Sequence, residues 1–535
     1  MKSKNIIYSL GLLVLAGASL SSCDSYLDEL PDNRTEITSE DQVVSLLTSA
    51  YPQSSFYGFV NECISDNIDD MGARYNKYDE RFPHQVYNWQ DITETDNDGT
   101  RNLWENSYNA IAAANQALVN IEEMGGPKTT KLKEAKAEAL LCRAYNHFIL
   151  VNEFCMNYNS ATSTSDMGIP YVTTPEKNVY VDYERGTVAE DYEKINKDIE
   201  EALPMIGDTH YSVPKYHFNT QAAYAFAARF NLFYEKWDKA VEYATKCLGS
   251  NPKSMLRDWT AMESYGITSD LTPRTNLYID ATANSNLLLC TAISYMGLWS
   301  GNYGVWGKYS HNSYISEHET FEAENLWGAS TGTNSRLRCP ALAFKGGSMD
   351  RVLVAKLPYL FEELDPVAKT GYFRTVYVPF KADLTLLERA EAYIMLKQYD
   401  KACEDLNLWI QNWTTVTKNY TPADIRSFYT QLPYSTSTNS TMRKHLHPAF
   451  TIDAEGSVQE CMLQCVLSLK RIETVYEGFR WWDIKRYGIN ITRRVMNADS
   501  EPDHVTDSLG TNDLRRAIQL PYDVIQAGLP ANPRN

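Results

Sequence analysis

The sequence predicts a mainly α-helical protein, in which a scaffold of tetratricopeptide-like helical hairpins carries long irregular, loop-rich insertions and a few short strands. Three observations lead to this fold class. Long stretches repeat apolar residues at helical spacing. Two helical pairs superimpose at a constant offset of 162 residues. The segments between the pairs are rich in Gly, Asn, Ser, Thr, Tyr and Trp and show little helical period.

The first predicted pair is "LWENSYNAIAAANQALVNIEEM" (103–124) and "KLKEAKAEALLCRAYNHFILVNEF" (131–154). Gly125, Gly126 and Pro127 interrupt the helical pattern between them, as expected at a turn between two helices.

The second pair is "AAYAFAARFNLFYE" with "KWDKAVEYATKCL", and the third is "LTLLERAEAYIMLK" with "QYDKACEDLNLWI". In the superposition Ala228 falls on Ala390, and Trp237 falls on Tyr399. Small residues at the helix crossing, followed by an aromatic residue and Asp at the turn, are the tetratricopeptide pattern. Each hairpin leaves an apolar face that only a neighbouring hairpin can cover, and a fourth helical region is expected near 458–487.

We expect one domain over 56–535, with the helical scaffold at about 101–250 and 380–490. The two insertions, about 56–100 and 250–380, are predicted to bind ligand. Loops this long are either functional or disordered, and their aromatic content argues against disorder.

The start of the chain is predicted to be a signal peptide of the lipoprotein type, residues 1–22. Lys2 and Lys4 precede an apolar run that is too short to span a bilayer and that ends in small residues. Leu-Ser-Ser-Cys resembles the bacterial lipobox, so Cys23 is the expected acylation site and 23–55 the anchor and N-terminal segment. Acyl chains would attach the protein to a membrane without a spanning helix. Acids close to Cys23 are compatible with the outer face of the cell.

Composition limits the classes of partner and reaction. The formal net charge of −18 argues against nucleic acid and anionic membrane as partners. The cysteine spacings do not describe a disulfide framework, so most of the thiols are expected to be buried. The sequence contains neither His-Glu-x-x-His nor Gly-x-Ser-x-Gly, and we predict no enzymatic activity. A pair of carboxylates for glycoside hydrolysis stays an open alternative.

Two segments resemble the RagB/SusD family of Bacteroidetes outer-membrane lipoproteins: "YLDELPDNRTEITSEDQVVSLLTSAYP" (26–52) and "RIETVYEGFRWWDIKRYG" (471–488). The end of the chain departs from the family's closing pattern. The resemblance implies a SusD-like fold and a surface lid that captures an oligosaccharide, or alternatively an oligopeptide, for a SusC-like TonB-dependent transporter. A protein-interaction scaffold and a surface glycosidase are the rival functions. Glu473, Glu477 and Arg480 have the spacing of ion pairs on one helix face, which predicts a structural network.

Two aromatic segments are the predicted ligand site. In "YMGLWSGNYGVWGKYSHNSY" (295–314), glycines separate four rings that are able to stack on a sugar or a peptide. In "RYNKYDERFPHQVYNW" (74–89), planar polar groups accompany further rings. The alternative is that these rings fill a local core. The candidate residues are Tyr75, Tyr78, Arg81, Asn88, Trp89, Trp299, Tyr303, Trp306 and Tyr309.

"ETDNDGTRNLWE" (94–105) is a candidate calcium loop. Glu94, Asp96, Asp98 and Glu105 occupy EF-hand positions one, three, five and twelve, although Arg101 stands at a normally aliphatic position. The alternative is a polar turn that caps the next helix. No other cofactor is expected.

Overall fold

The computed structural model describes residues 37–72, 81–176, 181–266, 270–301, 307–330, 335–345 and 350–534. These residues form a mainly helical fold with small sheets, which confirms the predicted fold class. The predicted signal peptide and Cys23 lie outside the described residues. Among the described residues, none of the helices is both long enough and apolar enough to cross a bilayer.

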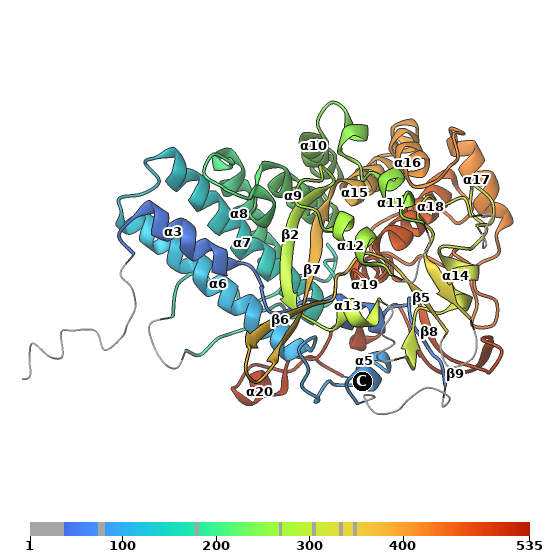
Figure 1. Ribbon diagram of the computed structural model, residues 1–535, viewed down its shortest axis with the longest axis horizontal. Helices are drawn as coiled ribbons and strands as arrows, with labels where there is room; N and C mark the ends of the chain where they lie inside the picture. Colours follow the sequence, from blue (N-terminus) through green and yellow to red (C-terminus); the bar gives the residue numbers. More distant parts are fainter. Residues whose placement is uncertain are drawn as a thin grey trace, which may run out of the picture.

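The first predicted pair is confirmed as α6 (Thr100–Glu123) and α7 (Thr130–Phe154). α7 is buried along nearly its whole length, because α6 and α8 (Val188–Ala202) pack against it and α3 (Glu40–Leu47) covers part of the pair (Figure 1). Gly125 and Gly126 take left-handed φ angles of 90° and 89° in the turn, where a side chain would be strained.

The repeat is confirmed down to its turns. α9 (Thr220–Phe233) and α10 (Trp237–Leu248) correspond to α15 (Ala382–Met395) and α16 (Tyr399–Trp413). Both turns place a left-handed residue at the same point, Glu235 with φ 60° and Lys397 with φ 58°. In both turns the next residue donates its N–H to the carbonyl five residues earlier, Lys236 to Asn231 and Gln398 to Tyr393, both at 2.8 Å. α10 packs on α15, so the two hairpins cover each other's apolar faces.

The predicted fourth helical region consists of α18 (Val458–Thr474) and α19 (Phe479–Arg486), next to α17 (Pro422–Gln431). The single helix face predicted for 473–480 is wrong, because the chain turns between α18 and α19 with Gly478 at φ 81°. The predicted network is nevertheless present. Glu473 pairs with Lys381 at 2.8 Å, and Arg480 pairs with Asp66 at 2.8 Å.

The second insertion contains more regular structure than predicted. It holds α11 (Trp259–Glu263), α12 (Thr272–Tyr278), α13 (Met296–Trp299) and α14 (Ser313–Glu319). β2 (Asn286–Ile293), β7 (Thr370–Lys381) and β6 (Leu360–Asp365) form an antiparallel sheet in the order β2-β7-β6. β4 (Leu342–Phe344) pairs with β5 (Arg351–Leu353). β2 and β7 run side by side next to the helical scaffold, and β6 lies at their lower end (Figure 1).

A further sheet joins distant parts of the chain in the order β3-β1-β8-β9. β1 (Asp69–Asp70) follows α4 (Gly58–Ile64), β3 (Tyr309–Ser310) belongs to the second insertion, and β8 (Ile491–Met496) and β9 (Pro502–Leu509) follow α19. α5 (Arg81–Tyr87) packs beside α4, and α20 (Tyr522–Gln526) lies near the end of the chain. This sheet therefore brings both insertions together with the C-terminal segment.

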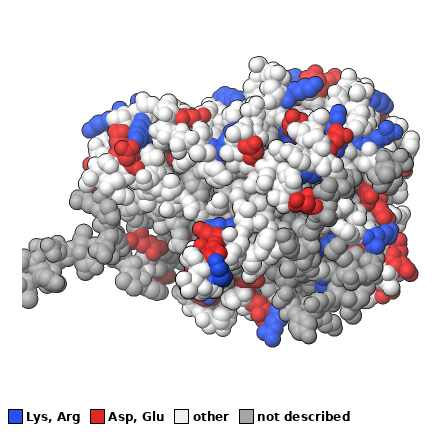
Figure 2. Space-filling view, in the orientation of Figure 1, with Lys and Arg blue, Asp and Glu red and all other residues white. Residues whose placement is uncertain are grey.

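The cysteine prediction is confirmed for the described residues. Their nine cysteines are unpaired, and all are buried except the half-buried Cys339. On the face shown in Figure 2, acidic and basic side chains lie in small mixed groups, and neither sign forms a continuous patch.

Candidate functional site

A polar cavity of about 180 Å³ opens beside the β3-β1-β8-β9 sheet. It lies where β1 and β8 begin, against the end of α14 and a loop rich in Ser and Thr. We call it the polar cavity, and its charged and polar lining consists of Asp66, Asp69, Glu319, Ser435, Thr436, Ser437, Ser440, Lys444, His445, Asn490, Thr492 and Arg494.

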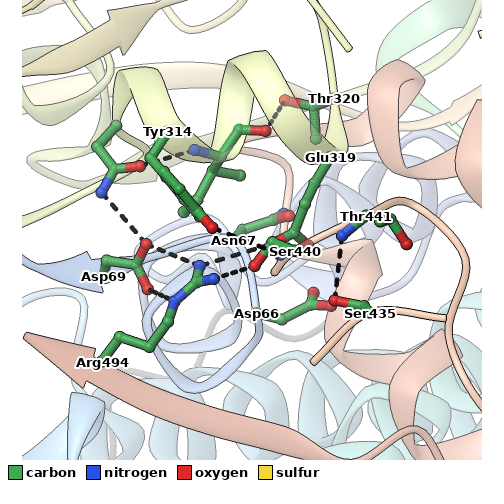
Figure 3. A network of polar contacts seen from close by, with 12 residues as sticks. Asp66, Asn67, Asp69, Tyr314, Glu319, Thr320, Ser435, Ser440, Thr441 and Arg494 are labelled. Atoms are coloured by element: carbon green, nitrogen blue, oxygen red, sulfur yellow. Dashed lines mark hydrogen bonds and ion pairs between the residues drawn. The ribbon is translucent and has the colours of Figure 1, made fainter. Parts of the chain in front are cut away.

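Arg494 belongs to the buried part of the lining, which we call the floor of the polar cavity, and Figure 3 shows its polar contacts. Its guanidinium donates to both carboxylate oxygens of Asp69, at 3.0 and 2.8 Å, and also to the Ser440 hydroxyl. The ring of Tyr314 lies 5.1 Å from the guanidinium carbon. Asn312 donates its amide to Asp69 over 3.2 Å. A two-pronged pair with further hydrogen bonds fixes the Arg494 side chain in one orientation.

Glu319 lies beside this pair and contacts three cationic side chains. Lys444 Nζ lies 2.6 Å and Arg471 Nη1 2.7 Å from one Glu319 oxygen, while Arg494 is 3.5 Å from the other. Burial alone would raise the pKa of Glu319, but Lys444 and Arg471 hold this pKa well below its usual range. The buried carboxylate is therefore ionised at neutral pH and compensated.

Asp66 completes the charged lining. Its carboxylate accepts two hydrogen bonds from Arg480, both at 2.8 Å. Burial opposes ionisation, yet Arg471 and Arg480 hold the pKa of Asp66 well below its usual range. A general acid needs a raised pKa, so neither Asp66 nor Glu319 is suited to donate a proton in glycoside hydrolysis.

The rim of the polar cavity is neutral and hydroxyl-rich. Ser435 accepts from Lys444 Nζ at 2.9 Å and from the Thr441 N–H at 3.2 Å, as Figure 3 shows for Thr441. Thr436, Ser437, Asn490 and Thr492 line the opening and are exposed or half-buried. Hydroxyl and amide groups both donate and accept, which suits a ligand that carries hydroxyl groups of its own.

Three rings predicted to contact ligand lie in the core instead. Trp299 is completely buried, and its indole N–H donates over 3.1 Å to the carbonyl of Tyr309, which is also buried. Trp89 is buried, donates to the carbonyl of Ile64 at 3.0 Å and lies under the guanidinium of Arg493. Their burial fits the alternative of a local core, and these rings offer no face for stacking.

Arg81 and Asn88 lie on and just after α5, Arg81 exposed and Asn88 half-buried. Tyr75, Tyr78, Tyr303 and Trp306 lie outside the described residues. The described parts of the two aromatic segments contact each other: His84 Nδ1 lies 2.9 Å from the Tyr309 hydroxyl, and the rings of Tyr87 and Tyr309 lie 4.8 Å apart. β1, which precedes the 74–89 segment, pairs with β3 of the other segment and supplies Asp69 to the polar cavity.

The predicted calcium ligands do not converge. Asp98 accepts from the Ser294 hydroxyl at 2.5 Å and the Tyr295 N–H at 2.8 Å, and burial raises its pKa to about 7. Glu105 pairs with Arg101 at 2.9 Å, Asp96 accepts from the Asp98 N–H, and the Glu94 N–H donates to Gln85. In the ranges that the structure describes, no group of three or more His, Cys, Asp or Glu is placed to hold a metal. The polar turn that precedes α6 is the better description.

The comparisons with known proteins agree with this fold. Residues 25–232 match a SusD-like family model described as starch-binding and associating with the outer membrane. Over this part, which is less than half of the chain, the sequence is SusD-like. No curated protein sequence matches it.

Solved structures show the same fold over nearly the whole chain. A SusD superfamily protein from Bacteroides thetaiotaomicron is 19% identical, with a TM-score of 0.62 and coverage of 93% of this chain and 100% of the other. A SusD superfamily protein from Bacteroides fragilis is 16% identical, with a TM-score of 0.61 and coverage of 93% and 99%. A SusD-like carbohydrate binding protein from Bacteroides vulgatus is 15% identical, with a TM-score of 0.58 and coverage of 92% and 97%.

Sequence reasoning missed the polar cavity. The run "YSTSTNSTM" (434–442) was a usable signal, since seven successive hydroxyl or amide side chains are unusual between helices. Arg494 and Glu319 gave no such signal, because their partners lie hundreds of residues away in the chain.

Proposed function

We propose that this SusD-like protein binds an oligosaccharide at the surface of the outer membrane and delivers it to a SusC-like TonB-dependent transporter. In this proposal the protein is tethered through acylated Cys23, faces the outside of the cell and performs no catalysis. The polar cavity carries the proposal, because a rigid charged floor lies beneath a rim of hydroxyl and amide groups. The starch-binding description of the family model and the carbohydrate-binding relative support the same ligand class.

The size of the polar cavity fits one part of a longer ligand. Sites that enclose a whole drug-sized molecule measure about 300–1,000 Å³, whereas this cavity measures about 180 Å³. A terminal unit of an oligomer would enter it while the remainder lies along the surface. The fixed ion pairs of the floor mean that little side-chain freedom is lost on binding, which favours affinity.

An oligopeptide is the alternative ligand. Lys444 and Asp66 reach the lining with 13% and 11% of their side chains exposed, and such charges could meet the termini or charged side chains of a peptide. The hydroxyl-rich rim favours the oligosaccharide, because it provides more neutral than charged groups.

Isothermal calorimetry tests the proposal. The purified protein is titrated with malto-, xylo- and manno-hexaose and with a mixed peptide pool. We expect heat from at least one hexaose, and at least tenfold weaker binding in Asn490→Ala and Thr492→Val. Thr438→Val is the control. Thr438 is exposed in the Ser/Thr-rich loop beside the polar cavity but does not line the cavity. Binding of peptides alone would change the ligand class, and binding of neither would overturn the proposal.

The location and the transporter need separate tests. Cys23→Ser should abolish incorporation of labelled palmitate and release the protein from the membrane fraction. Protease treatment of intact cells should cut the wild-type protein, and a barrel-sized membrane protein should co-purify with it. A protein that stays uncut in intact cells would contradict the outward orientation.

A further inference from the structure

An exposed two-stranded ribbon forms where β6 pairs with the first part of β7, at the lower end of these strands in Figure 1. All six residues of β6 are exposed, and β7 becomes fully buried only from Thr375 onward. Five of the eleven large apolar side chains that are exposed in the described ranges lie on this ribbon or its turn: Leu360, Phe361, Leu364, Val367 and Tyr372. Exposed apolar patches of this kind usually mark a binding surface.

Hydrogen bonds and an ion pair stabilise the ribbon. At its turn Asp365 accepts hydrogen bonds from the N–H groups of Val367 and Ala368, at 2.8 and 2.9 Å. Lys369 pairs with Glu363 at 3.0 Å across the strands. A Cβ at Gly371 would lie 1.9 Å from the Glu362 carbonyl oxygen, so the close approach of the two strands requires glycine there.

One face of the ribbon carries four aromatic rings, which we call the aromatic platform: Tyr295, Tyr359, Phe361 and Phe373. Phe361 stands opposite Phe373 in the strand register, with ring centroids 5.3 Å apart. Tyr359 stacks on Phe373 at 4.9 Å and 28°, and Tyr295 approaches Phe373 at 5.6 Å. Phe361 is 46% exposed, and the other three rings are half-buried. The packed rings hold the exposed face of Phe361 in a fixed orientation.

A small cavity of about 120 Å³ adjoins the aromatic platform. Its lining combines Tyr359 and Leu360 with Asp270, Thr272, Thr275 and Asn276, which belong to α12 and the residue pair before it. Asp270, Thr272 and Asn276 are exposed. Gly297 also lines the cavity, and a Cβ there would come within 2.2 Å of the Pro358 carbonyl oxygen. Tyr359 belongs to both the aromatic platform and the cavity lining, so the platform borders a carboxylate, hydroxyls and an amide.

We propose that the aromatic platform and this cavity form a second carbohydrate site, separate from the polar cavity. The ligand would be an oligosaccharide that places the apolar C–H face of one pyranose unit on the exposed ring of Phe361. Its hydroxyl groups would bind the planar groups of Asn276 and Asp270. The inference rests on the proposed function for the glycan class of ligand. A purely apolar surface would suit a protein partner, but polar groups facing rings suit a ligand that is apolar on one face and hydroxylated at its edge.

The test uses the hexaose panel and calorimetry on Phe361→Ala and Asn276→Ala. Leu364→Ala is the matched control, since Leu364 is 58% exposed on the same strand and makes no ring contact in the aromatic platform. We expect two hexaose sites in the wild-type protein. Both site variants should bind hexaose at the second of these sites at least tenfold more weakly, and the control should stay within twofold of wild type at both sites. All variants should keep the wild-type melting temperature.

The possible outcomes separate this inference from the proposed function. Wild-type affinity in both site variants would overturn the second site and leave the proposed function in place. Weaker binding in Phe361→Ala with unchanged binding in Asn276→Ala would also overturn the carbohydrate assignment, because the polar wall would then play no part. Absence of hexaose binding by the wild-type protein would overturn both proposals.

Discussion

Replacing Arg494 by Met should destabilise the protein strongly. The substitution keeps an unbranched side chain but removes the cation that donates two hydrogen bonds to Asp69 at 3.0 and 2.8 Å. Asp69 is 2% exposed, so its carboxylate would stay buried with only the Asn312 amide as a described hydrogen-bond donor. Removing one partner of a buried ion pair costs about 3–5 kcal/mol.

Urea unfolding followed by circular dichroism measures this loss. Arg374→Met is the matched control, because Arg374 also pairs with a carboxylate, that of Glu362, but the two side chains are 30% and 44% exposed. An exposed pair contributes about 0–1 kcal/mol, so the control should stay near wild type.

The buried charge of Asp69 leads to a further expectation for a double variant. Adding Asp69→Asn to Arg494→Met removes the uncompensated carboxylate, and the double variant should regain most of the lost stability. If Arg494→Met cost no more than Arg374→Met, or if the double variant were less stable than the single one, the view of the floor as a compensated ion pair would be refuted.

Three further predictions concern the core, the ribbon and acid stability. Trp299→Ala should lower the unfolding free energy by about 3–5 kcal/mol, because the ring is fully buried; unchanged stability with lost ligand binding would instead restore its ligand role. Gly371→Ala should accelerate hydrogen exchange of the β6 amides, whereas Gly510→Ala, with open space around it, should not. Arg486 and Lys470 outweigh burial and lower the pKa of Glu391 from 4.5 to about 2, so its contribution to stability is present above pH about 4.5 and is lost as the pH falls toward about 2. In Glu391→Gln the urea midpoint should therefore fall less steeply with decreasing pH over that range. A pH dependence equal to that of the wild type would contradict this assignment.

The helical scaffold could be predicted because its information is local. Helical period, the glycines after α6 and the repeated turn at Glu235 and Lys397 all lie within a few residues of the elements that they define. The β3-β1-β8-β9 sheet could not be predicted in this way. β1 and β3 are two residues long, and their partners lie hundreds of residues apart. Strands that short carry no period, so only tertiary packing defines them.

The candidate site shows the same division. The two aromatic segments were found by composition, and their described parts do contact each other through Tyr87 and Tyr309. Composition does not encode exposure, however, and Trp89, Trp299 and Tyr309 are buried. Carbonyl oxygens accept from the indole N–H groups of both tryptophans, and the Tyr309 hydroxyl lies 2.9 Å from Nδ1 of His84. The exposed rings of the ribbon were overlooked, since Phe361 and Phe373 stand among charged residues and show no repeated spacing.

The floor of the polar cavity is connected to the helical repeat. Its floor joins Arg471 of α18, Glu319 of α14, Arg494 of β8 and Asp69 of β1 in one set of ion pairs. α18 packs on α15, so the floor is anchored in the helical repeat rather than in the loops around it. Each buried charge depends on the others, and a shift of one element would leave a charge uncompensated at a cost of several kcal/mol. Substitutions in the rim would therefore leave the geometry of the floor in place.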